Sequence, residues 1–107
     1  MKRFREIFIT VFISLLLLST VAYGDTWIKS VRLTNNAGDS EYPAIAVDGS
    51  NIYVLWEDFT PGNGEIYFKR SDDGGNTWTM DKRLTNNTGS SWYPAVAVDG
   101  SNIYVVW

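Results

Sequence analysis

An internal repeat of 51 residues is the feature that most restricts the fold of this chain. Residues 26–56 align with residues 77–107, and 22 of the 31 aligned pairs are identical. The longest shared blocks are RLTNN, at 32–36 and 83–87, and YPAIAVDGSNIYVLW, at 42–56, which recurs at 93–107 with two changes. A period of this size indicates that one supersecondary unit recurs and packs against its own copies. The sequence therefore predicts an array of similar units.

Each period contains four short segments with the pattern of a β-strand. Apolar residues alternate, or β-branched and aromatic residues gather, between turn-forming stretches such as Asp48-Gly49-Ser50-Asn51. Helical periodicity is absent after the N-terminal segment. Four short antiparallel strands in about 50 residues are typical of one β-propeller blade. The predicted strands are 43–48, 52–56, 65–70 and 78–85.

The register of the repeat predicts an all-β chain of about one and a half four-stranded antiparallel blades, preceded by a signal-peptide helix. On this interpretation the chain is the N-terminal piece of a longer propeller, whose remaining blades are its partners. Because so few blades leave apolar faces open, we expect residues 25–107 alone to associate or to be only partly ordered. The predicted parts are a signal peptide (1–24) and a partial propeller (25–107), comprising the fourth strand of a preceding blade (25–36), a complete blade (37–87) and the start of the next (88–107).

The N-terminal segment has the pattern of a secretory signal. The basic stretch MKRFR precedes an apolar run, and the small residues Ala22 and Gly24 suit cleavage after Gly24. The alternative is a retained membrane anchor, although the apolar run of 7–22 is shorter than the ~20 residues of a spanning helix. We therefore expect a protein of the cell envelope or the exterior, with membrane contact through this segment alone.

The composition excludes several kinds of chemistry. The chain has no Cys and no His, which removes disulfides, thiolate or imidazole metal sites, and Cys/His or Ser/His catalysis. After residue 24, eleven Asp and Glu face six Lys and Arg, a formal charge of about −5. A chain this acidic, with no basic stripe, is not expected to bind nucleic acid. No cofactor is predicted.

The stretch SDDGGNTW, at 71–78, contains adjacent carboxylates, and its residues predict a tight turn. It does not fit a calcium loop of the EF-hand type. An ionised aspartate can accept backbone N–H bonds across a turn, and glycine can take a positive φ. The stretch resembles the S-x-D-x-G-x-T-W pattern of the Asp-box, or BNR repeat. The five matching residues are Ser71, Asp73, Gly75, Thr77 and Trp78.

The resemblance to Asp-box propellers implies a fold and two functions. In that family the box is a hairpin turn between the third and fourth strands of a blade, away from the active face. The family includes sialidases, which bind the substrate carboxylate with three arginines and use a Tyr–Glu nucleophile and an Asp acid/base. The arginine that precedes proline in their first motif is absent at Tyr42-Pro43 and Tyr93-Pro94. We therefore expect a non-catalytic extracellular binding or scaffold module, with a glycan or protein ligand, and keep as the alternative a sialidase-like glycoside hydrolase with its catalytic residues in other blades.

Three residues are candidates for contact with a ligand, and none is assigned a catalytic or metal-binding role. Glu57 and Asp58 follow an apolar strand, so they face either a central channel or solvent at the strand end. Trp92 takes the place of Glu41 in the second copy and so departs from the repeat. The repeated aromatic residues have two interpretations, as packing between blades or as stacking surfaces for sugars.

Overall fold

The structure is a computed structural model that describes Gly24 and residues 29–107. The chain divides into two units, 1–31 and 32–107, and the fold described below is that of the second. The predicted signal-peptide helix and most of its cleavage region lie outside the described residues.

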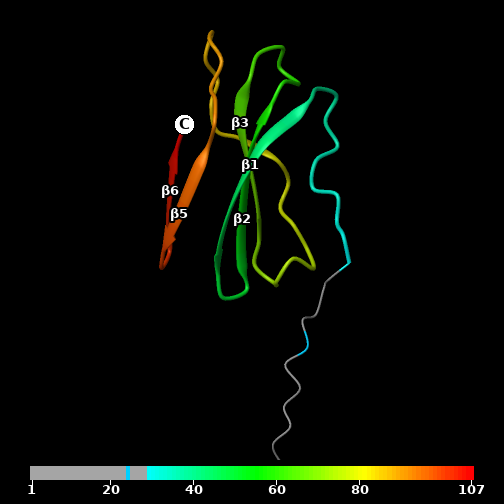
Figure 1. Cartoon of the computed structure of the whole chain (residues 1–107), viewed down its shortest axis with the longest axis vertical. Coiled ribbons are helices and arrows are strands. Elements are labelled where there is room, and N and C mark those ends of the chain that lie inside the picture. Colours follow the sequence, from blue (N-terminus) through cyan, green and yellow to red (C-terminus); the bar gives the residue numbers. More distant parts are fainter. Residues whose placement is uncertain (1–23, 25–28) are drawn as a thin grey trace, which may run out of the picture. The chain divides into compact units, whose positions relative to one another are not determined.

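Residues 32–107 form two antiparallel sheets (Figure 1). The first has the strand order β1-β2-β3-β4, and the second pairs β5 with β6. The expectation of an all-β fold is confirmed for residues 29–107, in which no helix occurs. The strands are β1 (Ser40–Asp48), β2 (Asn51–Asp58), β3 (Glu65–Ser71), β4 (Lys82–Arg83), β5 (Ala95–Asp99) and β6 (Asn102–Val106).

The hairpins β1–β2 and β5–β6 are copies of each other in register as well as in sequence. Ala44 pairs with Leu55 in the first hairpin, and Ala95 pairs with Val106 in the second. Both turns contain a glycine with positive φ, 58° at Gly49 and 56° at Gly100, a conformation that costs glycine little because it has no Cβ. The repeated sequence thus builds the same hairpin twice.

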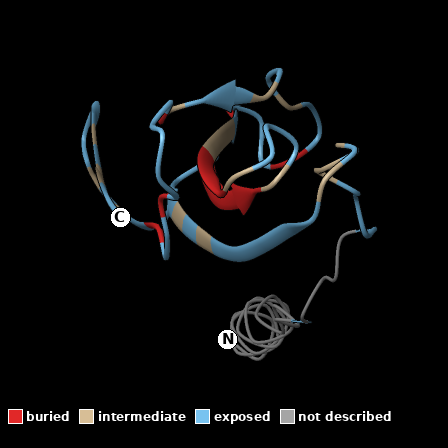
Figure 2. Ribbon diagram, turned by 90° about the horizontal axis from the view of Figure 1, so that it is seen from above, coloured by how far each residue is buried: buried red, intermediate tan, exposed pale blue. Residues whose placement is uncertain are grey.

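The core lies around β2, which lies between β1 and β3 in the first sheet (Figure 2). Leu55 is 0% exposed and Trp56 2%. Because successive residues of a strand point to opposite faces, burial of both means that both faces of the sheet are covered at β2. The rings of Trp56 and Tyr67 stack at 6.0 Å across β2 and β3, which adds to the apolar burial.

The fourth strand is shorter than the sequence predicts. The prediction was 78–85, whereas β4 contains only Lys82 and Arg83. Thr79 still pairs with Arg70 through its N–H, at 2.9 Å, but Arg83 is in register with Tyr67. The two pairings differ by one residue in register, so the edge is interrupted by an irregularity of the β-bulge type. The fourth strand predicted for a preceding blade, at 25–36, is not formed in its described part either, since residues 29–36 lie outside any strand.

Candidate functional site

The turn of residues 71–78 is held by side chains that bond to one another and to the turn's own backbone. Asp73 Oδ2 accepts from the Thr77 hydroxyl at 2.6 Å, and Oδ1 accepts from the Thr77 N–H at 2.8 Å. The Ser71 hydroxyl donates to Asp73 Oδ1 at 2.8 Å and accepts from the Gly75 N–H at 2.8 Å. Trp78 Nε1 donates to the Gly75 carbonyl at 3.0 Å. All five residues of the sequence pattern therefore meet in one network.

The adjacent carboxylates of this turn, Asp72 and Asp73, bond to different partners. Asp72 forms an exposed ion pair with Arg70 at 3.3 Å, whereas Asp73 bonds to the turn. Gly74 and Gly75 have positive φ values of 69° and 91°, and this conformation lets the chain reverse its direction within the turn. Among residues 24 and 29–107, no group of three or more acidic, His or Cys side chains is placed to hold a metal ion.

The hydrogen bonds from Thr77 and Ser71 lower the pKa of Asp73 from its ordinary 3.8 to about 2. A carboxylate whose pKa is lower in the folded state stabilises the fold above its unfolded pKa, and this contribution disappears as the pH falls through the folded pKa. We therefore expect Asp73→Asn to lower the unfolding temperature at pH 7, and we expect the difference from the wild type to vanish between about pH 4 and pH 2. Thermal unfolding followed by circular dichroism at several pH values measures it.

Asp72→Asn is the matched control for this pH dependence. Asp72 is exposed, and exposed ion pairs contribute little to stability, so its substitution should leave the unfolding temperature almost unchanged at every pH. A deficit of Asp73→Asn that stayed the same at pH 2 and pH 7 would contradict the role of the ionised carboxylate.

Glu57 and Asp58, the two carboxylates considered as ligand-facing, are both 0% exposed. Neither a ligand-facing position nor a solvated strand end therefore describes them, since neither side chain reaches the surface of the described residues. Glu57 accepts a hydrogen bond from the Tyr93 N–H through Oε1, which links β2 to the second copy of the repeat. Its Oε2 is buried without a partner among the described residues.

Asp58 forms hydrogen bonds with residues that precede β1 or begin it and with the loop that follows β2. Its Oδ2 accepts from Asn36 Nδ2 at 2.5 Å, the Ser40 hydroxyl at 3.0 Å and Trp56 Nε1 at 3.0 Å. Its Oδ1 accepts from the Thr60 N–H at 2.9 Å. Burial raises the pKa of Asp58, but the hydrogen bonds from Thr60, Asn36 and Trp56 lower it by more, so the net pKa lies below its ordinary value. The carboxylate is thus ionised and committed to the fold.

Two glycines at the same repeat position, Gly38 and Gly89, should respond differently to replacement by alanine, because only Gly38 packs against the loop that follows β2. A Cβ on Gly38 would lie 2.3 Å from the Thr60 N and 2.4 Å from the Phe59 carbonyl carbon, both of which are backbone atoms. Gly38→Ala must therefore displace this loop, and we expect a loss of about 1–3 kcal/mol in the free energy of unfolding, as for other overpacked sites. Urea unfolding measures it.

The matched control is Gly89→Ala, 51 residues further on. A Cβ on Gly89 would have no atom within 4 Å, and alanine restricts the unfolded chain, so this variant should be neutral or slightly stabilising, by up to about 1 kcal/mol. Equal losses in the two variants would refute the steric explanation.

Glu65 is a further structural carboxylate, which the sequence analysis did not single out. It is 0% exposed and accepts from the Thr85 hydroxyl, from the Asn87 N–H at 3.0 Å and from Asn63 Nδ2 at 3.0 Å. Arg83 lies 3.1 Å from it. The sequence signal that could have indicated this role is the recurring RLTNN block. Its Arg and Thr need a hydrogen-bond acceptor, and Glu65 is a carboxylate at a strand end in the same period.

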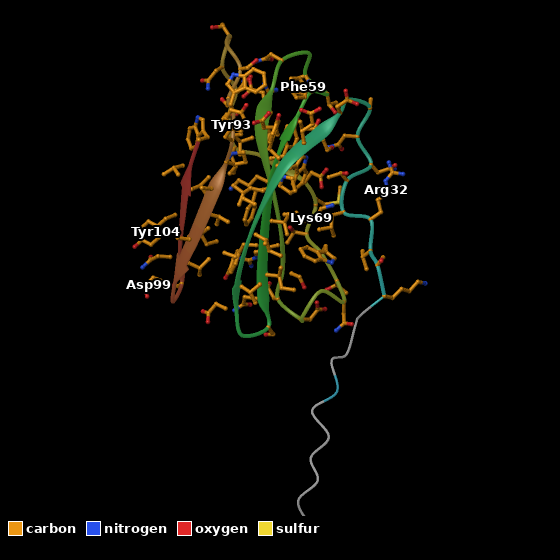
Figure 3. All side chains as sticks on the ribbon, in the orientation of Figure 1. Arg32, Phe59, Lys69, Tyr93, Asp99 and Tyr104 are labelled. Atoms are coloured by element: carbon orange, nitrogen blue, oxygen red, sulfur yellow. The ribbon has the colours of Figure 1, made fainter. Side chains whose placement is uncertain are left out.

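Aromatic side chains gather at the end of the strands where the two repeats meet. The rings of Tyr42 and Tyr93 meet edge to face at 4.8 Å, and those of Phe59 and Trp92 lie 5.8 Å apart. Tyr42 is 50% exposed, Trp92 45% and Tyr93 65%. Figure 3 shows Phe59 and Tyr93 at the same end of the molecule. We call Tyr42, Phe59, Trp92 and Tyr93 the aromatic cluster.

The backbone at the two tyrosines is unusual. Tyr42 has φ 47° and Tyr93 φ 53°, a region that residues other than glycine rarely adopt. In the first copy the irregularity in the β1–β2 register falls at this point, between Glu41 and Ala44. Tyr42 thus lies within the irregularity of β1, and backbone outliers of this kind are frequent at functional sites.

Comparison with protein-family models, curated proteins and solved structures finds no match to this chain. Within the described residues, no helix has the length and apolar character needed to cross a membrane.

Proposed function

We propose that this chain belongs to an exported β-propeller of the Asp-box type and acts as a non-catalytic extracellular binding module. The turn of residues 71–78 supports the assignment, because it joins the third and fourth strands of an antiparallel sheet through all five residues of the pattern. The recurrence of one hairpin, in the same register, supports a bladed architecture.

The aromatic cluster is the observation that carries a binding function. Buried tyrosine and tryptophan rings are common in any core, but three of these four rings keep about half or more of their surface exposed. Exposed apolar residues gathered in one place mark interaction sites more often than scattered ones do. Ring faces beside polar hydroxyl and indole N–H groups suit a sugar, which presents both C–H and O–H groups.

The carboxylates nearest the cluster bond within the fold. Glu57 and Asp58 are both 0% exposed, so neither reaches a ligand at the cluster. Glu57 contacts the Tyr93 backbone and Asp58 holds the loop. The net negative charge of the chain further favours a neutral glycan over an anionic one. The ligand that best fits the cluster is therefore a neutral oligosaccharide.

The test is binding of the exported protein to an array of neutral and anionic oligosaccharides, followed by titration of the best ligand. We expect Trp92→Ala to weaken binding about tenfold or more, because truncating a central aromatic contact costs on the order of 2 kcal/mol. Met80→Ala is the control, since Met80 is 89% exposed and lies outside the cluster. Absence of binding to every oligosaccharide, or unchanged binding by Trp92→Ala, would refute the proposed glycan site.

A further inference from the structure

The loop between β4 and β5 contains a sequence pattern that the proposed function does not use. The triplet Asn86-Asn87-Thr88 has the form N-x-T, in which x is not proline, and this form occurs once in the chain. It is the acceptor pattern for N-linked glycosylation of exported proteins. A glycan is bulky and polar, so the folded protein can carry one only where the asparagine side chain reaches solvent. The position of the triplet in the fold therefore decides its meaning.

The acceptor asparagine and the threonine of the triplet both reach solvent. Asn86 and Thr88 are exposed and lie outside any strand. Figure 1 shows the loop that precedes β5 projecting beyond the start of that strand. Within the described residues, the hydrogen bonds of positions 86–88 all belong to Asn87. A sugar attached to the Asn86 amide would therefore displace no hydrogen bond of the fold.

The middle residue of the triplet fixes the loop to the body of the sheet. The Asn87 N–H donates to Glu65 Oε1 at 3.0 Å, and the Asn87 carbonyl accepts from Asn63 Nδ2 at 3.1 Å. Its side chain donates to the Ser91 hydroxyl at 3.2 Å. Because Glu65 is 0% exposed, these bonds reach the interior. Asn86 is thus presented to solvent from an anchored backbone.

The first copy of the repeat has the same two asparagines without the pattern. The triplet Asn35-Asn36-Ala37 lies 51 residues before Asn86-Asn87-Thr88. Asn35 is exposed, as Asn86 is, but Ala37 lacks the hydroxyl that the pattern requires at the third position. The two copies therefore offer an exposed asparagine with the hydroxyl and one without it. Only the second copy is expected to be an acceptor.

We propose that Asn86 is a site of N-linked glycosylation. Asn86 Nδ2 attacks the anomeric carbon of an oligosaccharide carried on a lipid diphosphate, in the active site of a transferase of the exporting cell. The bond between Nδ2 and the anomeric carbon forms, and the bond from that carbon to the diphosphate oxygen breaks. The lipid diphosphate leaves, and the proton from Nδ2 passes to a base of the transferase. No group is oxidised or reduced.

This inference rests on the export included in the proposed function, because the pattern is an acceptor in secreted proteins. It does not depend on glycan binding by the aromatic cluster. The two can therefore fail separately, and the experiment follows export and modification by different readouts.

The experiment uses the full chain as the organism that produces it exports it. Trypsin cleaves after Lys and Arg, so it places Asn86 in the peptide that begins at Leu84 and Asn35 in the peptide 33–69. The peptides are treated with a glycosidase that hydrolyses the bond between a glycan-bearing Nδ2 and its carbonyl carbon, in water labelled with heavy oxygen. This reaction turns a glycosylated asparagine into labelled aspartate, which fragment mass spectrometry locates. A sample without the enzyme corrects for spontaneous deamidation.

We expect labelled aspartate at position 86 and unlabelled asparagine at positions 87 and 35. Thr88→Ala, exported from the same host, should lose the label although Asn86 is still present, and Thr88→Ser should keep it. The matched change, Ala37→Thr, completes the pattern in the first copy and should add a label at Asn35.

Two results would overturn the inference and leave the export intact. One is an exported wild type without a label at Asn86, and the other is a label that persists in Thr88→Ala. A chain found only in the cytoplasm, without a label, would overturn the export and the glycosylation together.

Discussion

Replacing Glu65 by alanine is expected to lower the free energy of unfolding by about 3 kcal/mol or more, because several donors lose a charged acceptor and each such hydrogen bond contributes about 1.5–3 kcal/mol. The carboxylate is 0% exposed and accepts hydrogen bonds from Thr85, Asn87 and Asn63. Its loss would leave Thr85, which is only 4% exposed, without its charged acceptor, and it would also remove the partner of Arg83 at 3.1 Å. Urea unfolding followed by tryptophan fluorescence measures the change.

Two further variants separate the charge of Glu65 from its shape. Glu65→Gln retains the size and one acceptor but loses the charge, so its loss should be smaller than that of alanine. Glu41→Ala, at an exposed position, should change the free energy by no more than about 0.5 kcal/mol. If Glu65→Ala were as stable as Glu41→Ala, the network would contribute nothing to stability.

The pH dependence of Glu65 follows from the same contacts. Burial raises the pKa of Glu65. The hydrogen bonds from Thr85, Asn87 and Asn63 lower it by a larger amount, so the net pKa lies below the ordinary value. The ionised form therefore stabilises the fold above the unfolded pKa, and the contribution is lost as the pH falls through the folded pKa. The deficit of Glu65→Gln should accordingly be greatest near neutral pH and shrink in acid.

The hairpins were predictable from the sequence because their signals are local. Asp48-Gly49 sets the turn, and alternation sets the faces, so the predicted strands 43–48, 52–56 and 65–70 fall within β1, β2 and β3. β4 was not predictable in length. Its register slips by one residue between the pairings of Thr79 and Arg83, and this slip depends on the turn before it and on β3 beside it.

In the candidate site, too, local contacts could be predicted from the sequence and long-range contacts could not. The residues of the 71–78 turn lie within eight positions, so their network could be inferred from side-chain chemistry alone. Asp58 and Glu65 could not be assigned, because their partners Asn36 and Thr85 lie 22 and 20 residues away. A carboxylate at a strand end looks solvated in the sequence, and only the fold places donors around it. The approach of Phe59 to Trp92 likewise depends on how the repeats meet.

Leu55→Ala should lower the free energy of unfolding by about 2–5 kcal/mol, the range for large-to-small substitutions in a core. Leu55 is 0% exposed on the central strand and pairs with Ala44 on one side and Phe68 on the other. The small Ala44 cannot fill the space that a missing isobutyl group leaves, so a cavity would remain. Thermal and urea unfolding of the variant measure the loss.

The counterpart of Leu55 in the second hairpin gives the sharpest comparison. Val106 occupies the same repeat position but is 66% exposed, so Val106→Ala should leave the stability of a single chain within about 0.5 kcal/mol of the wild type. Urea unfolding at low protein concentration, where chains are separate, measures the change. A large stability loss at low concentration would mean that Val106 is already covered within one chain.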